Sequence, residues 1–443
     1  MRLEVCLNEV GRQASWKQLG HLRSTIGLDW VRQALRRTQA ETIRRRKLPH
    51  EAVVWLVVGI ALFRERSIDA VVKHLELARS SDPPVPSPTG SPISSAAVAQ
   101  ARHRIGSGPL AELFKITAES WTSEFIETNR WRDLQVFAID GSGLRIADTP
   151  ANEEFFGRPG SGRSKAAYPQ ARIVTVLAVG SRLVCDSAIG NQKQGEQSLA
   201  RDLIERMPDR SVLILDRGFV NHTMFARTMV AGTERHFLCR AKANLVSKRV
   251  RIFGRNDSLV QINVSAPDRR EDPALPETIT VRLIQYTIPG FRPATLVTSL
   301  LDPERFPRSE IVDLYHKRWE IETAYDEIKT HTLERDETIR SRSPELVLQE
   351  IYGILVAYNL LRVAMARAAA IAGVAAARMS FCNSLLEIRD FFSLAADTAP
   401  GNLPGLYRRL CSRLALLVLP ERRPRRYLRA VKIKMSNYKR KDF

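Results

Sequence analysis

Residues 134–141 read LQVFAIDG, and residues 210–218 read RSVLILDRG. Each is a short apolar run that ends in an aspartate, and the second is suited to a buried central strand. Ligands and metals gather where the strands of an α/β sheet end, so Asp140 and Asp216 are candidates for a functional site. An aspartate close to a glycine is also a common turn residue, so neither run alone decides between a site and a turn.

The segments around these two runs continue the strand pattern. Residues 171–180 (ARIVTVLAVG) and 182–190 (RLVCDSAIG) predict two further strands, and a helix is predicted around 195–206. Residues 235–301 are again rich in predicted strands, which read HFLCRAK, VQINVSA, TITVRLIQY and PATLVTSLL. The middle of the chain is therefore predicted to be rich in strands, with helices between some of them.

A long helix is predicted to follow, capped by Ser309 and reading EIVDLYHKRWEIETAYDEIKTH over residues 310–331. At about 100° per residue, one arc of roughly 60° on this helix carries four polar side chains. They are Tyr315, Arg318, Glu322 and Lys329. The neighbouring stripe is expected to pack on the core and carries Leu314, Ile321, Tyr325 and Ile328.

Helical spacing alone does not single out Glu322 as a functional carboxylate. Asp326 falls on the same stripe. A solvated face with ordinary i,i+4 ion pairs, each worth only about 0.2–0.5 kcal/mol, is an equally open interpretation. Trp319, about 40° from Tyr315 around the helix, is expected to pack in the core, with stacking on a DNA base as the second interpretation.

The charge balance favours a polyanionic partner. Lys and Arg outnumber Asp and Glu by 68 to 48, a formal charge of +20, which suits nucleic acid or an acidic membrane surface. The apolar run at 52–63 is too short to span a bilayer, and Arg362 and Arg367 interrupt the run at 351–377. Both runs are expected to be buried helices, and no membrane partner is expected. The five cysteines are widely spaced without a CxxC pair, which indicates a reduced, cytosolic protein without a zinc site.

Taken in order, these segments resemble the DDE transposases of bacterial insertion sequences, in the subgroup with the signature Y-x2-R-x3-E-x6-K. The signature is matched by Tyr315, Arg318, Glu322 and Lys329. Two further segments resemble the same family: IDGSGLRIADTPANEEFFG at 139–157 and LDRGF at 215–219. The resemblance covers roughly residues 135–360.

The resemblance implies a ribonuclease-H-like mixed sheet with flanking helices, an α/β fold interrupted by a β-strand-rich insertion. It implies that Asp140, Asp216 and Glu322 are catalytic and hold two Mg²⁺ ions, which Mn²⁺ can replace. Two such ions about 3.5–4 Å apart stabilise both the attacking and the leaving oxygen of a phosphodiester. Tyr315, Arg318 and Lys329 are expected to contact DNA. The expected partners are the terminal repeats of the element and target DNA, bound by a homodimer in the bacterial cytoplasm at the nucleoid.

Composition and resemblance together predict the order of domains along the chain. We expect an N-terminal helical DNA-binding region (1–80), a Pro-rich linker (81–95), a helical connection (96–134), the first part of the core (135–234), a β-rich insertion (235–305), the second part of the core (306–380), and a C-terminal helical region with a basic tail (381–443).

Two alternatives stay open at this point. One is a related metal-dependent nuclease that does not transfer strands, and the other is a DNA-binding derivative that has lost catalysis. The family also includes members that form a DNA hairpin and place a tryptophan on the strand before the signature helix. In this chain that region reads IPGFRPATLVTSLLD and has Phe291 but no tryptophan, so the cleavage route is left open.

Overall fold

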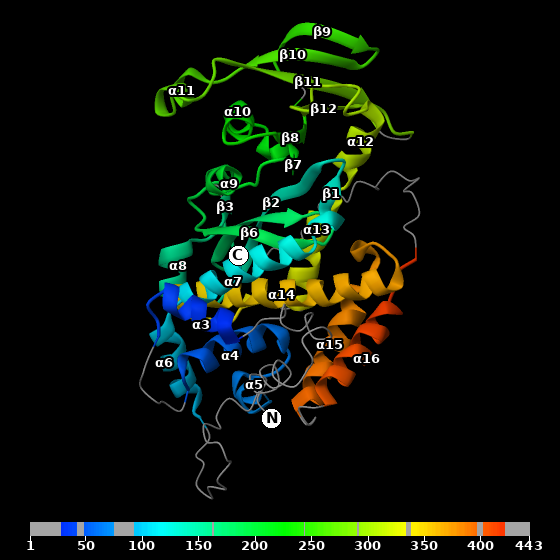
Figure 1. Cartoon of the computed structure of the whole chain (residues 1–443). Coiled ribbons are helices and arrows are strands. Elements are labelled where there is room, and N and C mark those ends of the chain that lie inside the picture. The colour runs from blue at the N-terminus through cyan, green and yellow to red at the C-terminus, as the bar shows by residue number, and fades with distance from the viewer. Residues whose placement is uncertain are drawn as a thin grey trace, which may run out of the picture.

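The computed structural model describes residues 28–41, 48–74, 93–161, 164–242, 244–289, 292–333, 338–396 and 402–420. Phe291, most of the Pro-rich linker and the basic tail at 421–443 lie outside the described residues. Figure 1 shows a sheet that separates two sets of helices, with further strands continuing from one of its edges.

The centre of the fold is a mixed sheet with the strand order β6-β5-β2-β7-β8. Strands β2 (Leu134–Ile146), β7 (Ser211–Leu215) and β8 (Arg235–Arg240) run parallel. Strand β5 (Gln170–Ala178) pairs antiparallel with β2, and β6 (Leu183–Gly190) pairs antiparallel with β5. The predicted strands of this region are present, which confirms that their apolar runs were read correctly.

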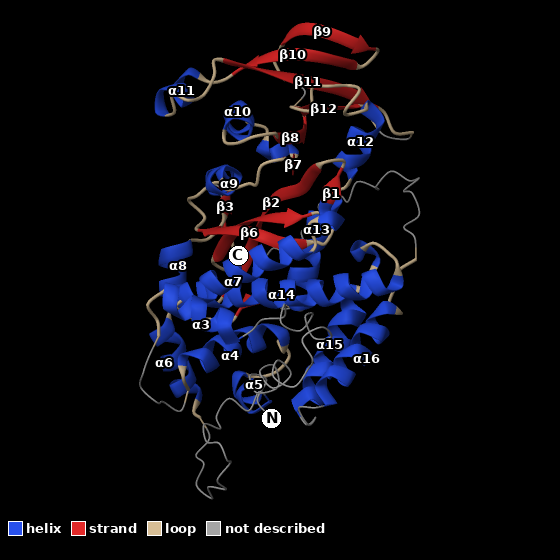
Figure 2. Cartoon of the chain, in the orientation of Figure 1, coloured by secondary structure: helices blue, strands red, loops and turns tan. Residues whose placement is uncertain are grey.

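The strand-rich segment that follows extends the same sheet. Strand β12 (Ala294–Thr298) pairs antiparallel with β8, and the order continues through β11 (Thr278–Tyr286), β10 (Asp257–Asn263) and β9 (Lys248–Gly254). Figure 2 shows these strands as an extension beyond the helices. The expected domain boundary at residue 235 therefore falls between two strands, β7 and β8, that pair along their length.

The two faces of the sheet bury alternate side chains of each strand, as the period of two requires. Phe137 and Ile139 of β2 join one apolar cluster together with helices α9 (Glu196–Glu205) and α10 (His222–Val230). Val136 and Ala138 join the other cluster, with α7 (Gly108–Glu124) and α14 (Pro344–Ala372). The second cluster also takes in α3 (Leu28–Arg37) and α4 (His50–Leu62), so the N-terminal helices pack continuously with the core.

Helix α14 runs beneath the sheet and is almost wholly buried (Figure 1). It is long and apolar enough to cross a membrane, yet 89% of its most apolar stretch is buried inside the fold. The Arg362 side chain is fully buried there. Its guanidinium donates hydrogen bonds to the main-chain oxygen of Ser181, which compensate for the loss of water. The expectation of buried helices at 52–63 and 351–377 is confirmed by the burial of α4 and α14.

The remaining elements are short or peripheral. They are α5 (Ile68–His74), α6 (Ser95–Ile105), α8 (Pro150–Phe156), α11 (Ala266–Glu271), α15 (Phe381–Ala396), α16 (Leu403–Ala415), β1 (Arg130–Trp131), β3 (Gly160–Ser161), β4 (Ser164–Lys165) and β13 (Thr338–Ile339).

The predicted single helix at 310–331 is in fact three consecutive segments. They are α12 (Arg308–His316), α13 (Trp319–Asp326) and a π-helical turn, η3 (Glu327–Thr332). Main-chain bonds of the i→i+3 type, such as Arg318 N to Tyr315 O at 3.0 Å, tighten the junction between α12 and α13. The predicted cap is also wrong, because the helix begins after Pro307 and Ser309 lies within its first turn.

The expected core stripe of this segment is confirmed, since its four residues Leu314, Ile321, Tyr325 and Ile328 are all buried. The interpretation of Trp319 as a core residue is wrong. Its side chain is 37% exposed, and the guanidinium of Arg318 lies 5.3 Å from its ring centroid. On a helix Trp319 lies about 140° from Leu314, beyond Tyr315, so its exposure follows from its distance around the helix from the buried stripe.

Candidate active site

Asp140 and Asp216 lie next to each other on adjacent parallel strands. The last paired residues of β2 and β7 are Ile139 and Leu215, so each aspartate is the next residue on its strand. Asp216 follows the end of β7, whereas Asp140 is inside β2, which continues to Ile146 while paired with β5. The prediction that Asp140 ends its strand is therefore wrong. Strand β2 outlasts β7 because its other neighbour, β5, is longer.

Arg318 joins the second aspartate to the signature glutamate. Its Nη2 lies 2.7 Å from Oε1 of Glu322, and its Nη1 lies 3.8 Å from Oδ1 of Asp216. The Arg318 side chain is only 13% exposed. Burial alone would lower the pKa of Arg318, but the charges of Asp216 and Glu322 raise it above its ordinary value. Helix α13 thus brings Glu322 to the edge of the sheet that carries both aspartates.

Asp326, the other acid of the predicted stripe, has different partners. Its Oδ1 accepts a hydrogen bond from the Thr330 hydroxyl at 2.9 Å, and its Oδ2 lies 3.8 Å from His331 Nε2. The side chain is 64% exposed. Asp326 is therefore engaged with its own helical segment, whereas Glu322 is engaged with the residue that contacts Asp216.

The carboxylates do not form the tight cluster that the sequence led us to expect. Within the described part of the chain, no group of three or more His, Cys, Asp or Glu side chains is arranged to hold a metal ion. The reason is visible in the ion pairs, because the guanidinium of Arg318 contacts the carboxylates of both Asp216 and Glu322. In this conformation the positively charged guanidinium of Arg318 pairs with these two carboxylates.

Asp140 is the acid whose environment is most perturbed. Burial raises its pKa to about 6, against the opposing effect of a 2.8 Å hydrogen bond from the Gly141 main-chain N–H. The negative charges of Asp216 and Glu196 raise the pKa further, and Arg318 lowers it. The position therefore disfavours an unbalanced negative charge and favours a nearby cation.

Lys329 and Tyr315 occupy different environments. The Nζ of Lys329 donates a hydrogen bond to Ser142 Oγ at 3.1 Å. Ser142 and Asp140 are two residues apart on β2 and project from the same face, so the ammonium lies on the face of Asp140. Tyr315 is 7% exposed, and burial raises the pKa of its phenol. Its expected contact with DNA would need a surface that this conformation covers.

Sequence reasoning missed Glu196. An added Cβ on Gly141 would lie 2.5 Å from Cδ of Glu196, so the Glu196 side chain rests directly over Gly141 beside Asp140. Glu196 is the first residue of α9, where an acidic side chain is common in any helix. Its position in the sequence therefore does not indicate a functional role, and only the packing of α9 on the sheet brings it to the site.

Comparison with known proteins assigns the family. A family model described as insertion element 4 transposase N-terminal matches residues 16–115, and one described as transposase DDE domain matches residues 131–360. Transposase InsG for insertion sequence element IS4 of Escherichia coli (strain K12) is 34% identical over 99% of this chain and 98% of its own length. Putative transposase InsZ of the same organism is 30% identical over 51% of this chain and 72% of its own length. The chain therefore belongs to the DDE transposases of the insertion element IS4 family.

A solved structure adds a more distant comparison. One chain of the cryo-EM structure of the piggyBac transposase synaptic complex with hairpin DNA aligns over 92% of this chain and 86% of its own length. The TM-score is 0.43 and the sequence identity is 11%.

Membership of the family settles the general activity. The protein is an enzyme that cleaves DNA and transfers its strands, and DNA is its partner. The mixed sheet with flanking helices is the ribonuclease-H-like fold of the DDE domain, as the sequence predicted. DDE transposases use divalent metal ions.

Proposed function

We propose that Asp140, Asp216 and Glu322 are the three catalytic carboxylates and that they hold two Mg²⁺ ions, for which Mn²⁺ can substitute. The observation that supports this most is the contact geometry. Asp140 and Asp216 directly follow the last pair of two adjacent parallel strands, and Arg318 contacts both Asp216 and Glu322. Carboxylate oxygens are the ligands that Mg²⁺ prefers, and the raised pKa of Asp140 favours a cation beside it. The donor set therefore fits such ions.

Bound ions would supply the positive charge that stabilises the attacking and leaving oxygens of the cleaved phosphodiester. The chain's own residues position the strand. Arg318, with its planar fork, and Lys329, as a point charge, are proposed to contact phosphates on the face of Asp140. Release of Arg318 from Glu322 would free the guanidinium for phosphate. Tyr315 is proposed as a further DNA contact in a conformation that uncovers it.

The regions outside the catalytic core are also proposed to bind DNA. The N-terminal helical region is proposed to read the terminal repeats of the element, and the basic tail at 421–443 to add affinity that does not depend on sequence. We place two copies of the chain on the paired ends, in the bacterial cytoplasm at the nucleoid. The proposed domain order is the one expected from the sequence, with β8 counted in the core sheet.

The experiment that tests this function is incubation of the purified chain with DNA carrying its flanking element ends, with Mg²⁺, Mn²⁺ or EDTA. Cleavage at the ends and joined products that depend on the divalent ion are expected. Cuts without joined products would favour a nuclease, and binding without cuts would favour a derivative that has lost catalysis. Denaturing gels of the same reactions would reveal a hairpin as a strand of doubled length.

A further inference from the structure

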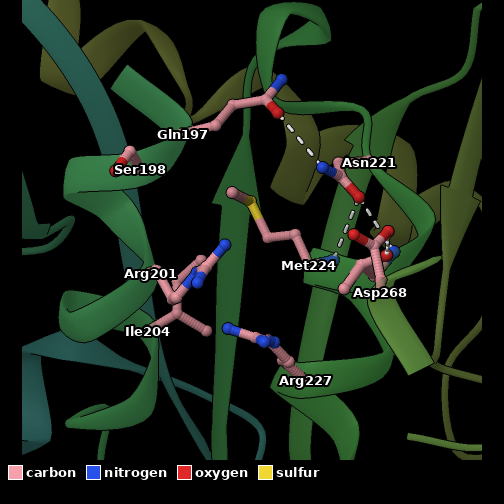
Figure 3. Close-up of a pocket in the computed structure, with 9 residues that line it drawn as sticks. Gln197, Ser198, Arg201, Ile204, Asn221, Met224, Arg227 and Asp268 are labelled. Carbon is pink, nitrogen blue, oxygen red and sulfur yellow. Dashed lines mark hydrogen bonds between the residues drawn. The ribbon is translucent and has the colours of Figure 1, made fainter. Parts of the chain in front are cut away.

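A pocket lies between α9 and α10, on the sheet face that these helices cover (Figure 3). Its two walls begin at the proposed active site. Helix α9 starts at Glu196, which rests over Gly141, and α10 is capped by Asn221, five positions after Asp216. The lining residues are Gln197, Ser198, Arg201, Ile204, Asn221, Thr223, Met224, Arg227 and Asp268.

Two arginine side chains from the two helices enter this pocket. Figure 3 shows the guanidinium groups of Arg201 and Arg227 turned into the same space beside Met224. Arg201 is exposed and makes no hydrogen bond or ion pair within the described residues. Its positive charge is thus uncompensated at the mouth of the pocket.

Arg227 is partly buried and only loosely paired. Its side chain is 13% exposed, and its Nη atoms lie 3.7 Å from Glu205 and 3.4 Å from Asp272, beyond good hydrogen-bond distance. Its Nε is buried and has no hydrogen-bond partner in the described part of the chain. Such an unsatisfied donor is costly, and an acceptor entering the pocket would relieve that cost.

The other polar groups of the pocket are already engaged. Asn221 donates a hydrogen bond to Gln197 at 3.2 Å, and Gln197 donates to the main-chain oxygen of Gly218 at 2.9 Å. The carboxylate of Asp268, the acidic group of the lining, accepts a hydrogen bond from Thr223. The donors left for a ligand are therefore the two guanidinium groups, which favour a phosphate or carboxylate.

We propose that this pocket binds a backbone phosphate of the DNA strand that passes the catalytic carboxylates. The proposal rests on the proposed function, since it places that DNA at Asp140. Arg201 is five residues after Glu196, about 8 Å along the axis of α9, and the pocket lies on the face of the sheet opposite to that of the Asp140 side chain. A strand crossing that edge brings a neighbouring phosphate between Arg201 and Arg227, which a guanidinium fork recognises without reading sequence.

The test uses element-end DNA in which single phosphates near the cleavage site are replaced, one at a time, by neutral methylphosphonates. Binding is measured in EDTA for the full-length native protein and for Arg201→Gln. At one position, the replacement should lower native affinity roughly tenfold, as expected for a lost hydrogen bond to a charged group. The same replacement should have a clearly smaller effect on Arg201→Gln, in which Arg227 is the remaining guanidinium contact. This variant should also flatten the slope of log K against log salt by about 0.9, the loss of one phosphate contact.

Arg206→Gln is the matched control, because Arg206 caps the C-terminus of the same helix but pairs with Asp186 at 2.9 Å outside the pocket. It should keep the methylphosphonate effect. The proposal is overturned if every position affects the native protein and Arg201→Gln alike. A second pair of results would also overturn it. Inorganic phosphate would raise the unfolding temperature of the native protein but not of Arg201→Gln, and no methylphosphonate position would distinguish the two proteins. The pocket would then bind a free anion and not a DNA phosphate.

Failure of the proposed function gives a different result. Asp216→Asn protein should retain the methylphosphonate effect in EDTA, because the measurement needs no cleavage. If Asp216→Asn still cleaves DNA normally and the methylphosphonate effect is present, the catalytic assignment is wrong and the proposed phosphate site is still supported.

Discussion

The hydroxyl of Tyr325 donates a hydrogen bond of 2.9 Å to the main-chain carbonyl of Asp140. The same hydroxyl accepts a hydrogen bond from Thr175 on β5, also at 2.9 Å. Helix α13, which carries Glu322, is thereby attached to two strands of the sheet at the position of the first aspartate. A single phenol thus links the helix that bears Glu322 to the strand that bears Asp140.

Replacing Tyr325 with Phe should loosen this attachment. It leaves two buried polar groups, the Asp140 carbonyl and the Thr175 hydroxyl, without this partner, which costs about 1–3 kcal/mol of unfolding free energy. Cleavage should fall while binding of the element ends is kept. Tyr168→Phe, at a side chain that is 48% exposed, is the control and should change neither property. Unchanged stability and cleavage in Tyr325→Phe would contradict the attachment.

The three proposed carboxylates should be essential for cleavage but not for binding. Asp140→Asn, Asp216→Asn and Glu322→Gln should each lower the cleavage rate by at least ~10²–10³-fold, as removal of groups that stabilise transition-state charge does. End binding in EDTA should stay close to native. Asp326→Asn is the control, because Asp326 contacts Thr330 and His331 instead. An active Glu322→Gln with an inactive Asp326→Asn would mean that the wrong acid was chosen.

Arg318→Gln should change how strongly divalent ions stabilise the protein. Without the guanidinium, Asp216 and Glu322 lose the cation that contacts them both, so their repulsion grows by an amount of the order of 1 kcal/mol. The unfolding temperature in EDTA should fall, and Mn²⁺ should raise it more than it does for native protein. Arg217→Gln, an exposed neighbour of Asp216, is the control. Equal stabilisation by Mn²⁺ in native and Arg318→Gln protein would refute this role.

Glu327 anchors the π-helical turn that carries Lys329. Its carboxylate accepts hydrogen bonds from Arg182 at 2.8 Å and from the Tyr358 hydroxyl at 2.9 Å, and its side chain is 5% exposed. Glu327→Gln breaks this buried pair and should cost about 3–5 kcal/mol in denaturant unfolding. Glu310→Gln removes an exposed pair with Arg132 and should cost only about 0–1 kcal/mol. Similar costs for the two variants would show that burial does not strengthen the Glu327 pair.

The raised pKa of Asp140 predicts how stability depends on pH in the absence of metal. The pKa is about 6 in the folded protein, against an ordinary value of 3.8 for an aspartate, so folding favours the protonated acid. Its stabilising effect is complete below pH 3.8 and is lost as the pH rises through 6. Asp140→Asn does not ionise, so it should be more stable than native protein at pH 8 by about 1–3 kcal/mol, and no more stable near pH 4. A difference that is constant from pH 4 to 8 would contradict the shift.

Local patterns predicted most of the elements around the site. Strands β7 (Ser211–Leu215) and β11 (Thr278–Tyr286) lie within segments whose apolar content indicated strands. Strand β9 (Lys248–Gly254) was not predicted, because it is an exposed edge strand rich in Lys and Arg and lacks a buried face. The break between α12 and α13 was missed as well, since side-chain periodicity does not reveal a local change in main-chain hydrogen bonding.

The sequence by itself determined which elements carry Asp140, Asp216 and Glu322, because apolar runs and helical spacing are local properties of the chain. Only the tertiary structure decided that Arg318 contacts both Asp216 and Glu322. It also brought Glu196 over Gly141 and turned Asp326 toward Thr330. The physical reason is that helical spacing relates only residues three or four positions apart. Contacts between distant residues depend on strand register and on the packing of every element between them.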